Sequence, residues 1–414
     1  MHRSVAAHRA AVLELLRDAW PAGTFDGGGS APLLDALDRV LGEDVRAVRA
    51  VPPFANSQMD GYAVHSADVP GTLAVAASIP AGSVPPPLVR GTAAPIMTGA
   101  MLPEGADAVV PVEEAVPPLF PSHDGGGPHT VALPAAHPGR FVRDEGSDIP
   151  AGTTAMAAGT QLTGRQLGLA AALGLAELPL RRRPRVLLLT TGDEVVPPGV
   201  PLPPGKIYDA NSILLRAALA QAGAEVVAPD AAPDRPHDFL ALLDAQLAAE
   251  ADRGGIDLIL STGGISAGAF EVVKQALSAE GVDFGHVAMQ PGGPQALGSY
   301  RGVPYLGFPG NPVSSVVSFE LFLRPALGEL VGAPAPRPVV LAHLRTALHS
   351  PAGKHQVRRG LYEPPGFESP GSVAEMGGPS SHLVGALAGA NALIQIPAGV
   401  TELQSGAKVE VWLL

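Results

Sequence analysis

Three glycine-bearing loops hold the residues of this chain that are best suited to binding a phosphate. They read Thr190-Thr191-Gly192-Asp193-Glu194, Ser261-Thr262-Gly263-Gly264-Ile265-Ser266 and Pro309-Gly310-Asn311-Pro312. Each follows a short apolar run that predicts a buried strand, and in an open parallel sheet ligands bind beyond the carboxyl ends of the strands. The loops are therefore predicted to converge on one ligand. Any one of them taken alone is as well explained by a tight structural turn.

The third loop shows how such a site is built. A strand is predicted over 303–308, and the chain then breaks at Pro309 and Gly310. Asn311 is a preferred helix N-cap residue and Pro312 suits the first helical position, so a buried helix is predicted to follow. The free N–H groups at the start of a helix, together with the helix dipole, favour an anion.

Carboxylates gather in and after these loops. They are Asp193, Glu194, Asp209, Asp234 and Glu271. Oxygen ligands suit Mg²⁺ bound together with ligand phosphates, whereas surface solvation is the plainer explanation for most acidic residues. The chain has no cysteine, which excludes disulfides, thiolate metal sites and a cysteine nucleophile. Its 12 histidines form no i, i+4 pair on a predicted helix, so a zinc hydrolase is not indicated.

A positive cluster follows later in the chain, from Lys354 through Arg358 and Arg359. It fits either an exposed edge strand with protective charges or a place where an oxyanion binds. The sequence contains neither a lysine-bearing P-loop nor a GxGxxG motif after a strand. Ordinary nucleotide hydrolysis and dinucleotide binding are therefore not indicated.

Composition limits the partners of this chain. A formal net charge of −12 argues against nucleic acid as the main partner. No apolar run approaches the roughly 20 residues that span a bilayer, and the beginning of the chain does not resemble a secretory signal. We therefore expect a cytoplasmic protein that has no membrane contact. At 414 residues, several domains are expected.

The hydrophobic pattern predicts four kinds of region along the chain. Helices are expected over 6–20, 31–40 and 163–175, with short β pieces over 71–79, 88–90 and 108–112 between the last two. From residue 185, strands (186–189, 224–227, 256–260, 303–308) alternate with helices (212–222, 239–249, 270–279). This alternation indicates a parallel sheet covered by helices. From about residue 333 the pattern is again typical of β structure, with strands expected over 392–396 and 408–414.

Several stretches resemble the molybdopterin molybdenumtransferases, the MoeA type that also forms the E domain of gephyrin. They are residues 56–64 (NSQMDGYAV), 96–100 (IMTGA), 104–110 (EGADAVV), 146–149 (GSDI), 261–266 (STGGIS) and 309–314 (PGNPVS). The resemblance runs nearly from end to end. It implies a multidomain fold with a discontinuous helical dimerisation domain (1–51 and 150–182), an inserted β domain (52–149), a molybdopterin-binding-like α/β domain (183–332) and a C-terminal β barrel (333–414).

The resemblance also implies an activity. The family inserts molybdenum from molybdate into adenylylated molybdopterin with Mg²⁺, and it releases AMP and molybdenum cofactor. The subunits form an elongated homodimer whose site lies between the α/β domain of one subunit and the inserted domain of the other. A contact with molybdopterin adenylyltransferase is compatible with this activity.

Site residues follow from the same resemblance. Asp60, Thr98 and Asp148 would act across the dimer; Asp60, Glu194, Asp234 and Glu271 would hold the metal; and Arg359 and Ser381 would hold molybdate. These catalytic positions are joined by residues expected to contact the pterin ligand, namely Thr191, Gly192, Asp209, Ser212, Gly263, Gly264, Ser266, Pro309, Gly310, Asn311 and Pro312.

The chain departs from the family where lysines are usual. His286, Gln290 and Gly293 stand in their place, and Arg235 follows Asp234. Losing fixed ammonium groups should weaken oxyanion binding. Two alternatives therefore stay open: a divergent pterin-binding paralogue or scaffold with little turnover, and a molybdopterin adenylyltransferase. The sequence also leaves open whether tungstate replaces molybdate.

Overall fold

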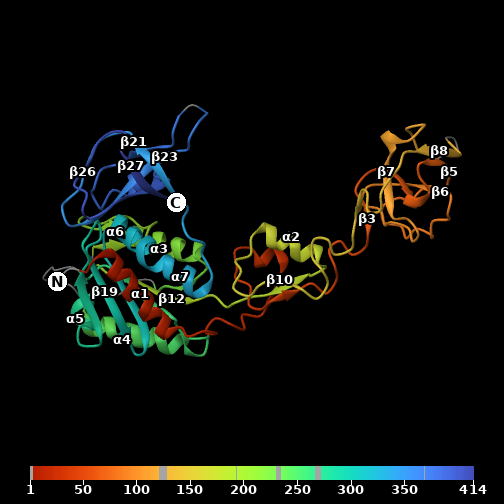
Figure 1. The fold of residues 1–414 in the computed structure, drawn as a ribbon. Coiled ribbons are helices and arrows are strands. Elements are labelled where there is room, and N and C mark those ends of the chain that lie inside the picture. Colours follow the sequence, from red (N-terminus) through yellow and green to blue (C-terminus); the bar gives the residue numbers. More distant parts are fainter. Residues whose placement is uncertain (1–2, 121–127, 193, 230–234, 266–271, 368) are drawn as a thin grey trace.

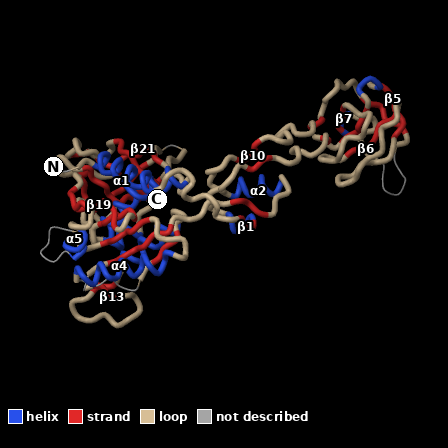
Figure 2. The backbone as a smooth tube through the Cα atoms, turned by 90° about the horizontal axis from the view of Figure 1, so that it is seen from below, coloured by secondary structure: helices blue, strands red, loops and turns tan. Residues whose placement is uncertain are grey.

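The computed structural model of this chain describes residues 3–120, 128–192, 194–229, 235–265, 272–367 and 369–414. The molecule is elongated, with a body at one end and an arm that projects from it (Figure 1). We call residues 3–25 and 182–414 the body and residues 30–180 the arm. The arm consists of a root next to the body and a tip, residues 51–149, and the arm also projects from the body in the perpendicular view of Figure 2.

A six-stranded sheet forms the centre of the body, in the order β15-β12-β16-β20-β19-β17. The first four strands are parallel and the last two are antiparallel to their neighbours, so the predicted parallel sheet is confirmed and ends in an antiparallel pair. The strands are β12 (Arg185–Thr190), β15 (Glu225–Val227), β16 (Leu258–Thr262), β17 (Val282–His286), β19 (Pro294–Tyr300) and β20 (Val303–Phe308).

Helices cover both faces of this sheet. On one face lie α1 (Val5–Ala19), α3 (Ala210–Gln221), α6 (Pro312–Ser318), a π-helical turn (Phe319–Leu323) and α7 (Arg324–Val331). On the other face lie α4 (Pro236–Ala251) and α5 (Val272–Leu277). Each of these contributes to one of two apolar cores on the sheet.

Helix α1 belongs to the core of the body. Ser4 caps it by accepting a hydrogen bond from the Ala7 amide, and His8, Val12 and Leu16 form a buried stripe at intervals of four residues. This stripe packs on the π-helical turn and α7. The helix predicted over 6–20 is therefore confirmed.

The arm root is built from short paired segments and one helix. Strands β1 (Ser30–Pro32) and β11 (Glu177–Pro179) pair, as do β2 (Val45–Arg46) and β10 (Thr154–Met156). Helix α2 (Gly164–Ala172) begins with a capping box formed by Thr163 and Gln166, which confirms the helix predicted there.

The helix predicted over 31–40 is wrong. Only Leu33–Ala36 forms a 3₁₀ turn, and β1 and an isolated bridge at Val40 occupy the rest. Asp38 has a φ of 61°, which ends any right-handed helix. Pairing of Ala31 and Pro32 with β11 thus takes the place of the first turn of the predicted helix.

The tip contains a five-stranded sheet in the order β7-β4-β6-β5-β8, with a ladder of β3 and β9 beside it. Its strands are β3 (Asn56–Ser57), β4 (Gly61–Val64), β5 (Gly71–Val75), β6 (Thr92–Ile96), β7 (Ala108–Pro111), β8 (Thr130–Leu133) and β9 (Val142–Arg143); short 3₁₀ turns lie at Ser66–Asp68 and Val112–Glu114. The predicted β character is confirmed, although the piece expected over 88–90 forms no strand.

The C-terminal strands close into a barrel. Strands β23, β24, β21, β27 and β25 pair in succession, and β25 returns to β23. The bounds are β21 (Val339–Leu344), β23 (His355–Glu363), β24 (Ser372–Glu375), β25 (Ala392–Ile396) and β27 (Lys408–Leu413), with α8 (Val384–Ala388) before β25. The expected barrel is confirmed. A further strand, β18 (Met289–Gln290), leaves the sheet domain and pairs with β23.

Two small ladders complete the body: β13 (Val195–Val196) with β14 (Ile207–Tyr208), and β22 (Leu348–His349) with β26 (Glu402–Leu403). Within the described ranges, no helix is long and apolar enough to cross a membrane.

Candidate active site

A cleft of ≈ 1090 Å³ opens at the carboxyl ends of β12, β16 and β20. The loops after these strands form its floor, the segments 207–211 and 290–294 form its sides, and a loop of the barrel at 379–384 faces them. Residues from all three predicted glycine loops line it: Thr191, Gly192, Glu194, Gly263, Gly264, Pro309, Gly310, Asn311 and Pro312. The convergence expected from the sequence is present.

Thr262, which is buried beneath the cleft, connects the second and third loops by hydrogen bonds. Its hydroxyl donates to the carbonyl of Pro309 over 3.0 Å, and it accepts from the amide of Asn211 over 3.2 Å. The Ser315 hydroxyl also donates to the Pro309 carbonyl, over 2.5 Å. Thr262 and Ser315 are fully buried, so this network holds the third loop against the second without access to water.

Asn211 extends the same network to helix α3. Its side-chain amide also donates to the Gly310 carbonyl over 2.6 Å, while its Oδ1 has no partner among the described residues. Asp209, which lines the cleft as well, is the N-cap of α3 and accepts from the Ser212 amide over 2.9 Å. Ser212 itself is not among the lining residues.

Two glycines allow the three loops to approach one another closely. Gly263 has a φ of 90°, and a Cβ there would lie 2.7 Å from the Thr191 carbonyl oxygen. Gly310 comes next, since a Cβ on it would lie 3.3 Å from the Gly263 Cα. Backbone groups of the three loops therefore lie at van der Waals distance from one another, as an amide-lined anion site requires.

The charge of the cleft comes from carboxylates and backbone groups. None of the described lining residues is lysine or arginine, whereas Glu194 and Asp209 are acidic. The Glu194 carboxylate folds back over its own loop, since a Cβ on Gly192 would lie 2.8 Å from its Oε2. Among the described lining residues, backbone amide N–H groups therefore supply favourable potential for an anion.

Asn311 is the N-cap residue of α6 and Pro312 its first residue, as predicted. The Asn311 side chain makes no capping hydrogen bond. Its amide group is thus not committed to the helix, and it lies at the surface of the cleft.

Arg359 stands behind the barrel wall of the cleft. Its guanidinium donates to the carbonyls of Gly378 over 2.5 Å and Ser380 over 3.1 Å, and the residue is 1% exposed. Burial lowers the pKa of this guanidinium from its ordinary value. Ser381 follows in the same loop, lines the cleft, and accepts from the Val313 amide through its carbonyl. Arg359 therefore shapes the loop that presents Ser381.

The positions that depart from the family pattern adjoin this wall. Gln290 lines the cleft and accepts from the Gln356 side chain of the barrel over 2.5 Å. Gly293 lies against His286, because a Cβ on it would come within 2.4 Å of the imidazole ring. A side chain at 293 would therefore require His286 to move, so these two replacements fit each other.

Three predicted residues belong to the arm tip, residues 51–149, which projects away from the body that holds the cleft (Figure 1). Asp60 accepts from the Thr98 amide over 2.7 Å and from its hydroxyl over 2.8 Å. The hydrogen bond from the Thr98 amide is the main cause that lowers the pKa of Asp60, and the hydrogen bond from the Thr98 hydroxyl lowers this pKa further. The Asp148 amide donates to the Val51 carbonyl. Asp60 and Thr98 thus form one unit, which the chain's own fold does not bring to Glu194.

Asp234, Ser266 and Glu271 lie outside the described residues. Among the described residues, no group of three or more histidine, aspartate and glutamate side chains could hold a metal ion. Of the predicted metal ligands, only Glu194 is a described residue of the cleft.

Asn211 and Thr262 organise the cleft but were not predicted from the sequence to do so. Thr262 is the last residue of β16 and belongs to the predicted Ser261–Ser266 loop, so its place at the end of the strand could have indicated a role. Asn211 carries no comparable signal, because a single asparagine in the first turn of a helix is common.

Models of three protein regions match the chain in succession. The MoeA N-terminal region (domain I and II) matches residues 3–174, a probable molybdopterin binding domain matches residues 187–329, and the MoeA C-terminal region (domain IV) matches residues 342–414. Body and arm together therefore have the architecture of a MoeA-type protein.

Full-length relatives place the chain more closely. Molybdopterin molybdenumtransferase 2 of Mycobacterium tuberculosis is 44% identical and covers 99% of both chains. Molybdopterin molybdenumtransferase of Haemophilus influenzae is 33% identical over 92% of each. The chain belongs to the molybdopterin molybdenumtransferase family.

Solved structures agree in fold. Two crystal structures of the molybdopterin biosynthesis MoeA protein of Pyrococcus horikoshii have TM-scores of 0.79 and 0.75, at 25% and 28% identity. Both cover 100% of this chain, and it covers 100% and 99% of theirs.

Proposed function

We propose that this chain is a molybdopterin molybdenumtransferase that inserts molybdenum from molybdate into adenylylated molybdopterin and releases molybdenum cofactor and AMP. The observation that carries the proposal is the convergence of three glycine loops on one cleft in a chain that matches the family over its whole length. Catalysis then depends on positioning and charge stabilisation, without a covalent intermediate on the enzyme.

The glycine loops bind the phosphates of the substrate. Amide groups around Gly263, Gly264 and Gly310 are held close together by the buried Thr262 network, so they are arranged for an anion before it binds. Preorganised donors of this kind need no rearrangement as charge develops on the phosphoanhydride.

Carboxylates of the cleft suit a hard cation. Glu194 would hold Mg²⁺ together with phosphate oxygens, and the family resemblance adds Asp234, Glu271 and the partner's Asp60 to this set. When bound, Mg²⁺ neutralises charge on the phosphoanhydride. The absence of lysine and arginine among the described lining residues makes this neutralisation more important here.

Molybdate is the second substrate. It binds beside Ser381 on the barrel wall, where Arg359 fixes the loop through the carbonyls of Gly378 and Ser380. From there a molybdate oxygen attacks the adenylate phosphorus of the anhydride, a new P–O bond forms, and the bridging P–O bond breaks as the molybdopterin phosphate leaves. The two dithiolene sulfurs of molybdopterin then bind the molybdenum, and the bond between molybdenum and the oxygen on the adenylate breaks. AMP leaves with that oxygen and one thiol proton, and the other thiol proton goes to solvent.

A homodimer completes the site. The arm tip, which contains Asp60, Thr98 and Asp148, projects away from the body (Figure 1), so in this proposal these residues serve the cleft of a second subunit. Leu34 and Val48 in the arm root are 84% and 82% exposed, which suits burial in a subunit interface. Within the proposal, the chain keeps the four domains predicted from the sequence. Separate apolar cores of the root, the tip and the barrel support this division. Helix α1, which lies in the predicted segment 1–51, packs instead on the core of the α/β domain.

The activity is tested by incubating the purified protein with adenylylated molybdopterin, Mg²⁺ and molybdate. AMP release that depends on molybdate is expected. Release that is independent of molybdate, or none at all, contradicts the proposal. Tungstate in place of molybdate tests which oxyanion is preferred.

The shared site is tested by mixing two inactive variants, Asp60→Asn and Glu194→Gln. If the arm of one subunit serves the other, half of the random dimers regain one of their two sites, and about a quarter of the wild-type activity returns. If each chain uses its own Asp60, mixing restores nothing.

A further inference from the structure

The arm is joined to the body by two chain segments, near residues 20–29 and 180–185. These segments hydrogen-bond to each other: the Leu180 amide donates to Gly29 and the Arg182 amide donates to Phe25, both over 2.8 Å. Between these bonds the two backbones are in contact at Gly28, where a Cβ would lie 2.4 Å from the Arg182 nitrogen. The two segments therefore form one ribbon, and only glycine at 28 permits it.

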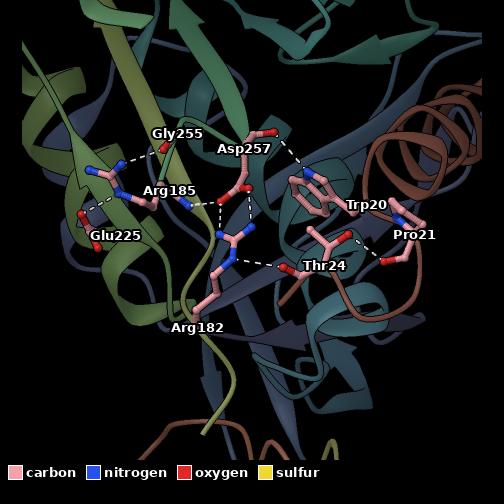
Figure 3. Close-up of polar contacts among 8 residues, drawn as sticks. All are labelled: Trp20, Pro21, Thr24, Arg182, Arg185, Glu225, Gly255 and Asp257. Carbon is pink, nitrogen blue, oxygen red and sulfur yellow. Dashed lines mark hydrogen bonds and ion pairs between the residues drawn. The ribbon is translucent and has the colours of Figure 1, made fainter. Parts of the chain in front are cut away.

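Arg182 attaches this ribbon to the body. Its guanidinium binds both oxygens of Asp257, over 2.7 and 2.8 Å, and its Nε donates to the Thr24 carbonyl over 3.0 Å (Figure 3). The Trp20 indole N–H donates to the Asp257 carbonyl over 3.0 Å. Asp257 thus binds a residue from each of the two connecting segments, Trp20 and Arg182. A bidentate pair of an arginine and a carboxylate fixes the orientation of the two groups as well as the distance between them.

An aromatic pair, Trp20 and Phe25, packs against Arg182. The guanidinium lies over the Phe25 ring, 4.8 Å from its centroid, and Trp20 meets Phe25 edge to face at 5.3 Å. Trp20 and Phe25 are 5% and 4% exposed. We call Trp20, Thr24, Phe25, Gly28, Arg182 and Asp257 the root clamp.

The clamp meets the sheet at the strands that carry the ligand loops. Asp257 directly precedes β16, and its carboxylate accepts from the amide of Arg185, the first residue of β12. The other ends of these strands lead to Gly263 and Thr191 in the cleft. The arm is therefore anchored at the amino ends of β12 and β16, the two central strands whose carboxyl ends position ligand loops.

We propose that the root clamp is a positioning device for catalysis, which sets the direction of the arm, and with it Asp60 and Thr98, relative to the ligand cleft. This inference rests on the proposed function, in which the arm of one subunit completes the cleft of the other. Each subunit has its own cleft in the body, and its arm contributes residues to the cleft of the partner. Because the clamp fixes the arm relative to the strands of the subunit's own cleft, it also fixes the position of one active site of the dimer relative to the other.

The clamp is tested first by distance measurement between spin labels in the full-length dimer. The chain has no cysteine, so Arg165→Cys on α2 in the arm and Ala248→Cys on α4 in the body label two exposed positions without background. Labelled chains are diluted with unlabelled chains, so that distances within one subunit dominate. We expect a narrow distribution that broadens in Asp257→Asn, Arg182→Lys and Gly28→Ala.

Activity supplies the second measurement. The same clamp changes, in chains without labels, should lower kcat about 10- to 100-fold, as misplacement of a catalytic group by about 1 Å does. Affinity for AMP, which binds in the body alone, should stay within twofold of wild type. Arg17→Gln is the matched control, because Arg17 forms a 2.6 Å ion pair with Glu329 inside the body, away from the ribbon. It should change neither the distances nor kcat.

Two results overturn the inference: an unchanged distance distribution in all three clamp variants, or a broadened distribution with unchanged kcat. A variant that fails to fold shows itself by lost AMP binding, and Arg182→Lys, which keeps the charge and loses only the fork, then decides. If the wild-type protein proves inactive, the proposed function fails, while the distance measurement still shows whether the clamp holds the arm.

Discussion

Replacing Gly263 by alanine should separate two of the three loops that form the floor of the cleft, the loops after β12 and β16. The residue has a φ of 90°, so an L side chain there costs about 1–2 kcal/mol from backbone strain alone. In addition, the new Cβ would lie 2.7 Å from the Thr191 carbonyl oxygen, closer than real Cβ contacts. Crowding of this kind costs about 1–3 kcal/mol more, because backbone atoms must move. The expected loss of unfolding free energy is about 2–5 kcal/mol.

Gly223 provides a matched control for the strain. It has a φ of 84° after helix α3, and a Cβ there meets nothing within 4 Å. Gly223→Ala should therefore show the strain without the crowding, about 1–2 kcal/mol. The difference between the two variants measures how tightly the loops are held together.

Urea unfolding followed by tryptophan fluorescence is the suitable assay. Both tryptophans, Trp20 and Trp412, lie in the body, so the signal does not report on the arm. Calorimetric titration with AMP and Mg²⁺ then shows the effect on the cleft. We expect Gly263→Ala to weaken AMP binding by tenfold or more and Gly223→Ala to leave it unchanged. Equal unfolding midpoints and equal AMP affinities for both variants would refute this account of the floor.

Three further predictions concern single side chains of the body. Burial, and then the charge of Arg3, lowers the pKa of His8 from 6.5 to about 4. The free energy of unfolding should therefore fall as the pH drops from 6.5 toward 4, by about 2 kcal/mol at pH 5. Urea midpoints at pH 7 and pH 5 should show this decrease, and His8→Gln should remove it. Asn211→Ala removes two hydrogen bonds worth about 0.5–1.5 kcal/mol each and should weaken AMP binding. Calorimetric titration measures this loss, and Arg216→Ala on the exposed side of the same helix is the control that should not change the affinity. Arg359→Lys keeps the charge but cannot bind two carbonyls in a fork, so it should raise the KM for molybdate at least tenfold; an unchanged KM would show that charge alone matters.

The body could be predicted well because its strands are apolar runs bounded by glycine and proline. The strands expected over 303–308 and 392–396 have the predicted limits. In the arm root, by contrast, the hydrophobic pattern predicted a helix over 31–40, whereas the chain pairs with β11 at the start of that range. The partner lies more than 140 residues away in sequence, and spacing within a short segment carries no information about it.

The candidate site was predictable in outline and not in detail. Glycine loops after strands indicate where a ligand binds, because the strands share one edge. The roles of Asn211 and Arg359 depend on contacts between elements that sequence patterns do not show. Arg359 was expected to meet molybdate, and the structure places its guanidinium on backbone carbonyls of the neighbouring loop. A direct contact with molybdate remains a prediction.

Strand β18 has a consequence for how the chain can fold. It pairs in parallel with β23 at His355 and Gln356, so the sheet domain completes an edge of the barrel. A C-terminal fragment that begins after residue 332 would expose this edge, and unpaired strand edges invite association with other chains. The barrel is thus not structurally complete on its own, because residues 289 and 290 of the sheet domain pair with its strand β23. Grafting the barrel onto another protein would require a substitute for these two residues far upstream.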